Sequence, residues 1–220
     1  MRLRQKPWAD SELLSNPLFL GECQNLRGIW SKYFENAHPL HLEIGCGKGQ
    51  FAIGSALENP DINFIAMEKE ERIICMALRA AKDAGLTNLR FVLKDAQELN
   101  EIFAPGELSR IYINFCDPWR SRGKWRKRRL THGGFLAKYE ELLQDGDLHF
   151  KTDSGELFYF TKYELEARKW HIYFETTNLH KDGICPIVTE YEQRFISKGM
   201  AIYSIKAGYT NEDRAGKAAF

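Results

Sequence analysis

Four carboxylates occur where apolar runs of the sequence are expected to end as buried strands. Glu43 lies in the first run, Glu68 ends the second, and Asp95 and Asp117 follow the third and fourth. The carboxyl ends of parallel strands form one rim of an α/β sheet, and ligands bind at that rim. A single acid there is commonly only a helix cap, so the argument depends on all four together.

A glycine-rich turn follows Glu43 directly. Gly45, Gly47 and Gly49 separate the first strand from an expected helix at residues 49–57, and this strand–turn–helix order opens nucleotide-binding α/β units. A pyrophosphate prefers a helix N-terminus without an adjacent acid. Glu43 therefore favours S-adenosylmethionine, which carries an ammonium and a sulfonium but no phosphate, over a dinucleotide such as NAD.

The candidate cofactor residues are assigned from this position on the rim. We expect Glu43, Gly45 and Gly47 to lie at the cationic end of S-adenosylmethionine. Glu68 is placed to accept both ribose hydroxyls, and Asp95 lies within reach of an adenine amine.

The fourth strand ends in the sequence Asn-Phe-Cys-Asp-Pro-Trp, which covers residues 114–119. Amine methyltransferases that act on bases commonly place an acid followed by two prolines and an aromatic here, whereas this chain has one proline. A ring nitrogen such as guanine N7 needs no proton removed, so catalysis there would be positioning and electrostatic support. Asp117 is the candidate catalytic residue. The alternative is that Asp117 only begins a turn.

Basic residues are concentrated immediately after Asp117. The net charge is only +1, but residues 120–129 contain seven Lys or Arg and no acid, with Trp119 and Trp125 nearby. Such a segment is a candidate contact for RNA phosphates, although many charge runs are only solvated loops.

The hydrophobic pattern predicts the elements that position these residues. Strands are expected at 40–44, 63–67, 89–93, 110–115, 147–151, 171–176 and 201–207. Helices are expected at 49–57, 70–84, 133–143, 155–168 and 189–197. Strands that alternate with helices indicate a mainly parallel sheet covered on both faces, with an antiparallel pair at one edge. Residues 1–36 are expected to form a basic extension with a short helix near 25–34, and residues 37–220 a single domain.

The spacing of the cysteines and histidines and the length of the apolar runs restrict the class of protein further. The five cysteines are scattered without a Cys-x-x-Cys pair, and the histidines share no ligand spacing, so no metal site is expected. No apolar run approaches the roughly 20 residues of a membrane helix. We expect a cytoplasmic protein that does not bind a membrane.

Several motifs together resemble the bacterial tRNA (guanine-N7)-methyltransferase family. They follow the family order and span nearly the whole chain. The matching pieces are Arg2-x-Arg-x-Lys-Pro-Trp8, Leu42-Glu-Ile-Gly-Cys-Gly-Lys-Gly49, Asn114-x-x-Asp-Pro-Trp119, Lys127-Arg-Arg-Leu130, Thr152-Asp153 and Thr189-x-Tyr-Glu192.

The resemblance implies a Rossmann-like class I methyltransferase fold with three layers, a seven-stranded sheet and an antiparallel C-terminal strand. It implies S-adenosylmethionine as the methyl donor and N7 of guanine 46 in the tRNA variable loop as the acceptor. The matched cofactor positions are Glu43, Glu68, Asp95 and Asp117, of which Asp117 also matches the catalytic aspartate. The matched substrate positions are Asp153, Thr189, Glu190, Tyr191 and Glu192.

One departure and several alternatives stay open. The family runs Asp-Pro-Trp-Pro-Lys, whereas Arg120 and Ser121 occupy the last two positions here. That lysine cannot be carried over, and Arg122 or Lys124 is a candidate replacement. Thr189-x-x-Glu192 also has the spacing of a capping box. The alternative functions are a non-catalytic RNA-binding module, a methyltransferase for another nucleobase position, or one for a small molecule. The protein is expected to be a monomer or a homodimer.

Overall fold

The computed structural model describes residues 13–119, 123–181 and 187–209. The strands are β1 (Phe19–Leu20), β2 (Leu40–Ile44), β3 (Asn63–Glu68), β4 (Leu89–Leu93), β5 (Leu108–Asn114), β6 (Leu143–Thr152), β7 (His171–Thr176) and β8 (Tyr203–Tyr209). The α-helices are α2 (Trp30–Tyr33), α3 (Gln50–Glu58), α4 (Glu71–Ala81), α5 (Leu99–Ile102), α6 (Gly133–Leu142), α7 (Gly155–Ala167) and α8 (Glu190–Ile196). The 3-10 helices are η1 (Cys23–Leu26), η2 (Ala96–Glu98) and η3 (Gly123–Arg128).

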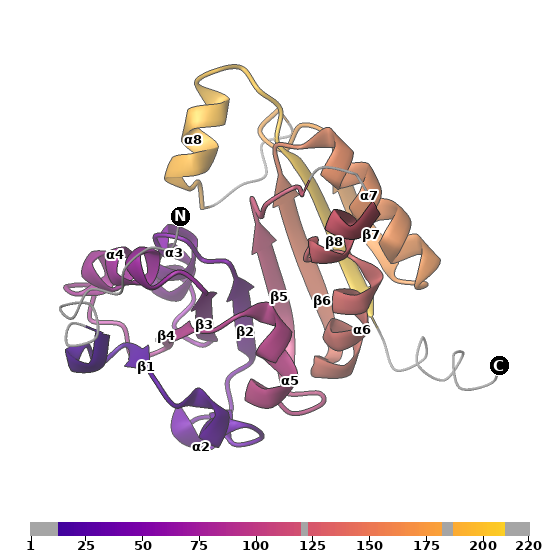
Figure 1. Cartoon of the computed structure of the whole chain (residues 1–220). Coiled ribbons are helices and arrows are strands. Elements are labelled where there is room, and N and C mark those ends of the chain that lie inside the picture. Colours follow the sequence, from indigo (N-terminus) through magenta and orange to yellow (C-terminus); the bar gives the residue numbers. More distant parts are fainter. Residues whose placement is uncertain (1–12, 120–122, 182–186, 210–220) are drawn as a thin grey trace, which may run out of the picture.

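The described strands form one sheet in the order β1-β4-β3-β2-β5-β6-β8-β7. Neighbouring strands from β1 to β6 pair in parallel, whereas β8 is antiparallel to both β6 and β7. In Figure 1 the arrowheads of β2, β5 and β6 point to the upper rim, and α8 lies above it. β2 and β3 are neighbours near the centre of the sheet, so their carboxyl ends lie side by side.

The predicted fold class is confirmed, with differences in detail. The sheet has one strand more than the expected seven, because Phe19 and Leu20 pair with β4. The expected helix near 25–34 is divided into η1 and α2, and Gly28 between them has a φ of 79°. The strand expected at 147–151 begins earlier, because β6 starts at Leu143 and follows α6 without a break.

Two hydrophobic clusters fill the spaces on the two faces of the sheet. One cluster joins the strands to α5, α6 and α7. The other joins β3 and β4 to α3 and α4. Alternate residues of a strand point to opposite faces, and accordingly Ile65 and Met67 of β3 lie in the first cluster while Phe64 and Ala66 lie in the second. Both faces of the central strands are therefore buried, which explains their continuous apolar runs.

The turn before α3 requires glycine for a steric reason. Gly49 is the N-cap of α3 with a φ of 78°. A Cβ at Gly49 would lie 2.9 Å from the Cβ of Ala77 and 3.1 Å from the ring of Phe91. The close packing of α3 against α4 and β4 thus fixes the start of the helix beneath the glycine loop.

The segment before β2 packs against the lower part of the sheet. Trp30 is 1 % exposed, its indole N–H donates to the carbonyl of Ile102 at 3.1 Å, and its ring stacks on Phe103. Burial of an aromatic of this size contributes roughly 2–3 kcal/mol to stability. Residues 13–36 therefore share a core with the sheet.

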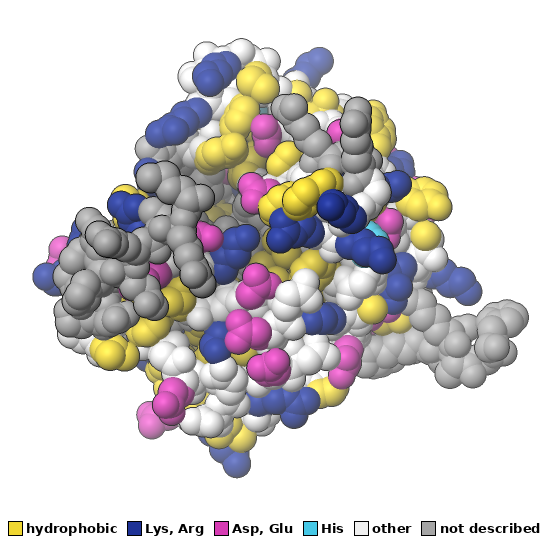
Figure 2. Space-filling model, in the orientation of Figure 1, with side chains coloured by type: hydrophobic (Ala, Val, Ile, Leu, Met, Phe, Trp, Pro, Cys, Tyr) yellow, Lys and Arg dark blue, Asp and Glu magenta, His cyan; other side chains and the backbone are white. Residues whose placement is uncertain are grey.

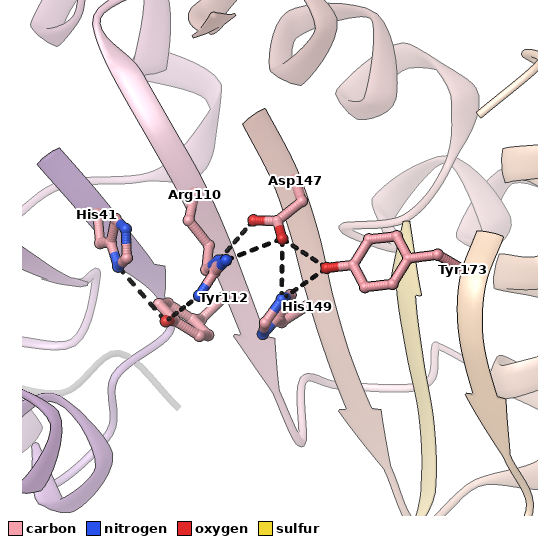
Figure 3. A network of polar contacts seen from close by, with 6 residues as sticks. All are labelled: His41, Arg110, Tyr112, Asp147, His149 and Tyr173. Atoms are coloured by element: carbon pink, nitrogen blue, oxygen red, sulfur yellow. Dashed lines mark hydrogen bonds and ion pairs between the residues drawn. The ribbon is translucent and has the colours of Figure 1, made fainter. Parts of the chain in front are cut away.

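A polar network joins residues of four strands, β2, β5, β6 and β7, on the face of α3 (Figure 3). Arg110 of β5 forms a bidentate ion pair with Asp147 of β6, and Asp147 also accepts hydrogen bonds from His149 and Tyr173. Burial alone would raise the pKa of Asp147, but the hydrogen bonds from His149 and Arg110 hold that pKa well below its usual range. The network continues to His41 of β2 through the hydroxyl of Tyr112.

Candidate active site

Two adjoining cavities lie at the carboxyl ends of the strands. The larger has a volume of about 620 Å³ and the smaller about 410 Å³, and they share Gly45, Ile73 and Phe115. Glu68, Asp95 and Asp117 line the larger cavity. The smaller cavity is lined by Glu43 and Gly47, together with residues of α8. Figure 2 shows acidic, basic and hydrophobic side chains together in the middle of the face that is turned toward the viewer.

Glu43 is a buried carboxylate at the centre of the rim. It is 3 % exposed, and its Oε1 accepts a hydrogen bond of 2.9 Å from Asn114 Nδ2 on β5. Its Oε2 is buried without a hydrogen-bond partner among the described residues. Burial raises the pKa of Glu43 to about 7, against the opposing effects of Asn114 and Lys151. An unpartnered carboxylate oxygen beside the glycine loop is a site for a cationic group.

Glu68 joins the end of β3 to the glycine loop. Its Oε2 accepts a hydrogen bond from the Gly47 amide at 3.1 Å, and its Oε1 accepts from the amides of Lys69 and Glu70. These contacts fix the carboxylate at the edge of the larger cavity. Gly45 and Gly47 have φ values of 76° and 56°, and a Cβ on either would project into open space. The loop thus leaves room for a ligand against its backbone.

Asp95 lies beyond β4 and has an exposed side chain. It is the N-cap of η2, where its Oδ1 accepts a hydrogen bond from the Gln97 amide at 2.9 Å, and it forms a capping box with Glu98. Asp95 therefore does cap a helix, which is the common role of a single acid at a strand end. Capping occupies Oδ1, and the residue still lines the larger cavity.

Asp117 lies in a short segment with unusual backbone geometry. Phe115 and Trp119 on either side have φ values of 54° and 33°, which are uncommon for residues other than glycine. Asp117 is exposed, lines the larger cavity, and has no hydrogen-bond partner among the described residues. Strained backbone conformations of this kind persist only where the surrounding structure maintains them, and they are concentrated at functional sites.

Within the described part of the basic segment, Arg128 lines the larger cavity. Lys124 and Arg128 are exposed in η3, and the Arg128 guanidinium lies 4.6 Å from the ring centre of Trp119 and 5.1 Å from that of Trp125. The two indole rings are parallel, with centres 5.8 Å apart. Arg122 lies outside the described residues. One expectation is corrected: Arg129 is buried and does not belong to the solvated basic surface.

The start of α8 covers the smaller cavity. Thr189 is its N-cap, and Thr189 and Glu192 form the capping box that the sequence spacing predicted. Glu192 is fully buried: its Oε2 accepts a hydrogen bond of 3.0 Å from Lys151 Nζ, and its Oε1 lies 3.4 Å from His180 Nε2. Glu190 is the first residue of α8, and its side chain is outside the described part of the chain.

Tyr191 and Asp153 lie close to Asp117. The ring of Tyr191 contacts that of Phe115, with centres 5.1 Å apart, and Tyr191 lines the smaller cavity. Burial raises the pKa of Tyr191, and the charges of Asp153 and Asp117 add to this effect. The structure thus brings the end of β5 and the start of α8 together at the two adjoining cavities.

Two further residues at the site have contacts that sequence patterns do not reveal. Lys151 is 8 % exposed and lies over the rings of Phe51 and Phe115. Arg129 contacts the backbone after Asp117. In the sequence, Lys151 lies within a strand, and Arg129 lies within a charge run and the Lys127-Arg-Arg-Leu130 motif, so the pattern did not indicate that either side chain is buried.

Neither a cluster of metal-ligating side chains nor a membrane-spanning helix occurs among the described residues. Within the described ranges, no group of three or more His, Cys, Asp or Glu side chains could hold a metal ion. None of the helices in that part of the chain has the length and hydropathy needed to span a membrane.

The fold and the rim define a class I methyltransferase. The chain resembles the solved structure of the 16S rRNA methyltransferase KamB with a TM-score of 0.62 and 13% identity, covering 82% of this chain and 92% of that one. It also resembles a 16S rRNA (adenine(1408)-N(1))-methyltransferase mutant solved with its cosubstrate SAM, from Catenulisporales acidiphilia, with a TM-score of 0.58 and 16% identity over 83% of this chain and 90% of that one. At these identities the likeness establishes the fold alone.

Sequence comparison identifies the family. A profile described as "Putative methyltransferase" matches residues 37–205. The chain is 44% identical over 217 residues to a tRNA (guanine-N(7)-)-methyltransferase of Staphylococcus aureus, covering 96% of this chain and 100% of that one. It is 43% identical to a protein of the same name from Halalkalibacterium halodurans, over 97% and 98% of the two chains. The chain therefore belongs to the tRNA (guanine-N7-)-methyltransferase family.

Proposed function

We propose that this protein transfers the methyl group of S-adenosylmethionine to N7 of guanine 46 in the variable loop of tRNA. The observation that carries the proposal is the placement of Glu68, Asp95 and Asp117 around one cavity, with Glu43 at the adjoining one. The names of the curated relatives support tRNA as the substrate and guanine N7 as the acceptor.

The residues of the rim fit S-adenosylmethionine on two observations. The buried Oε2 of Glu43 lacks a partner among the described residues, and a cationic ligand group would supply one. Gly45 and Gly47 leave open space where side chains would otherwise stand. Glu43 then holds the cationic end, Glu68 the ribose hydroxyls and Asp95 the adenine. When bound, S-adenosylmethionine supplies an electrophilic methyl group.

Catalysis in this proposal is positioning with electrostatic support. Guanine N7 has a free lone pair, so no base is needed to remove a proton from it. Asp117 holds the Watson–Crick edge of the guanine or stabilises the positive charge that develops on the ring. Thr189 and Tyr191, which line the smaller cavity, contact the nucleotide in this proposal, and Asp153 is a further candidate. Lys124 and Arg128 contact RNA phosphates, with Arg122 as a further candidate.

The test is incubation of the purified protein with tRNA and labelled S-adenosylmethionine, followed by nucleoside analysis. We expect 7-methylguanosine in wild-type tRNA and none in tRNA whose guanine 46 is replaced by adenine. Methyl on adenine, on an exocyclic amine or on another guanine would contradict the proposal. Binding of tRNA without binding of S-adenosylmethionine would favour a non-catalytic RNA-binding module.

The domain organisation and the compartment are two further parts of the proposal. We propose a single methyltransferase domain over residues 37–220 with residues 1–36 as its extension, and the matched profile begins at residue 37. The four described cysteines, Cys23, Cys46, Cys75 and Cys116, are free thiols, which supports action in the reducing cytoplasm. Limited proteolysis and size-exclusion chromatography with light scattering test the boundary and distinguish a monomer from a homodimer.

A further inference from the structure

Arg129 differs from its basic neighbours in burial and in partners. Its side chain is 1 % exposed, whereas Lys124–Arg128 are exposed. The Arg129 guanidinium forms an ion pair with Glu156 at the start of α7, and it lies 4.5 Å from the ring centre of Phe160. A guanidinium engaged in this way is not available to a phosphate of bound RNA.

The remaining contacts of Arg129 lead to the segment that carries Asp117. Its Nε–H is shared between the carbonyl oxygens of Pro118 at 2.8 Å and Trp119 at 3.1 Å. Before Asp117, the Phe115 amide donates to the carbonyl of Lys151 at 2.9 Å. The segment is thus fixed at both ends through its backbone, while the Asp117 side chain has no partner of its own in the described part of the chain.

We propose that Arg129 is a positioning residue that holds the Asp117–Trp119 backbone so that the Asp117 carboxylate faces the larger cavity. This proposal rests on the function proposed above. Trp119 adopts a φ of 33°, and such a conformation persists only when surrounding contacts maintain it. Hydrogen bonds from a charged group to the two carbonyls provide those contacts. Lysine cannot replace this planar group, which pairs with Glu156 and the backbone simultaneously.

The main experiment compares Arg129→Met with Lys127→Met in the full-length protein. For Arg129→Met we expect kcat on tRNA to fall about tenfold or more, since a hydrogen bond to a charged group is lost. The dissociation constants for tRNA and S-adenosylmethionine should change by less than about threefold, and the salt dependence of tRNA binding should not change. Lys127→Met should instead weaken tRNA binding and reduce the salt slope by about 1.

The same measurements can overturn the proposal. If Arg129→Met weakens tRNA binding and reduces the salt slope as Lys127→Met does, Arg129 contacts RNA. If the kcat of Arg129→Met equals that of the wild type, the conformation of the Asp117–Trp119 backbone does not depend on Arg129. Should Arg129→Met not fold, Glu156→Gln decides, because the Glu156 side chain is 55 % exposed. A kcat loss of about threefold or more with unchanged tRNA affinity supports the proposal, and an unchanged kcat overturns it.

A readout without RNA separates this inference from the proposed function. Hydrogen exchange of the Phe115, Cys116 and Asp117 amides should be faster in Arg129→Met than in the wild type, and unchanged in Lys127→Met. Unchanged exchange in Arg129→Met overturns the positioning role even if the protein methylates tRNA. Faster exchange in a protein without tRNA activity supports the positioning role and contradicts only the proposed function.

Discussion

Asn114 donates a hydrogen bond of 2.9 Å to only one of the two carboxylate oxygens of Glu43. The second oxygen is buried and unpartnered among the described residues, and burial raises the pKa of Glu43 to about 7. The protonated form of Glu43 is therefore populated near neutral pH. A cationic ligand favours the ionised form, so binding must release a proton.

The first prediction concerns pH and donor affinity. Below pH 7 the free carboxyl is mostly neutral, and affinity for S-adenosylmethionine should fall by up to about tenfold for each pH unit, because one proton must be displaced. Titration calorimetry between pH 5.5 and 7 in buffers of different ionisation enthalpy measures both affinity and proton release. The control is Glu43→Gln, which should bind weakly with little pH dependence; an unchanged pH profile in this variant would contradict the prediction.

The second prediction concerns Asp117. Asp117→Ala should lower kcat on tRNA by about a hundredfold or more, the effect of removing a group that supports transition-state charge. Binding of S-adenosylmethionine should weaken less than turnover, because Glu43, Glu68 and Asp95 remain. Single-turnover kinetics and calorimetry give the two quantities. Normal turnover by Asp117→Ala would exclude a catalytic role for this residue.

The third prediction concerns the buried pair of Lys151 and Glu192. Lys151→Met leaves the fully buried Glu192 carboxylate without its ammonium partner, which should cost about 3–5 kcal/mol of stability. The KM for tRNA should rise as well, since Glu192 helps to hold the α8 N-terminus over the site. Urea unfolding and steady-state kinetics test both effects.

A double variant provides the matched control for this pair. Lys151→Met combined with Glu192→Gln removes both charges, and we expect it to be more stable than Lys151→Met alone. Equal or lower stability of the double variant would show that the charge pair is not the source of the loss.

The fourth prediction concerns stability in acid. Burial lowers the pKa of His41 to about 3, below the ordinary value of 6.5. Between these values the unfolded chain binds a proton at this residue that the folded chain excludes, so the contribution of His41 to stability should fall as pH decreases from 6.5, by up to about 1.4 kcal/mol per pH unit. His41→Gln should reduce this slope in urea unfolding between pH 4.5 and 6.5. The control His171→Gln replaces an exposed histidine and should leave the slope unchanged.

Sequence patterns were sufficient for the features that depend on local order along the chain. The alternation of apolar runs with helical patterns predicted the central strands, and the Thr189-x-x-Glu192 spacing predicted the capping box. Acids at strand ends were expected on one rim because parallel strands end together. In the structure, three of them line one cavity and Glu43 lines its neighbour.

The features that were missed depend on contacts between distant parts of the chain. Arg129 belongs to a charge run that resembles a solvated surface, and its burial depends on Glu156 and Phe160 of α7. Lys151 meets Glu192 across a separation of 41 residues. The strand β1 has two residues, which is too few for any periodicity to identify.

The position of β8 between β6 and β7 has a consequence for synthesis on the ribosome. β7 is made before β8, but among the described strands its backbone pairs only with β8. Until β8 has emerged from the ribosome, β7 and the adjoining edge of β6 lack the strand with which both of them pair. Completion of the sheet is therefore expected only after β8 has been made, and a ribosome stalled before Tyr203 would hold an incompletely folded protein.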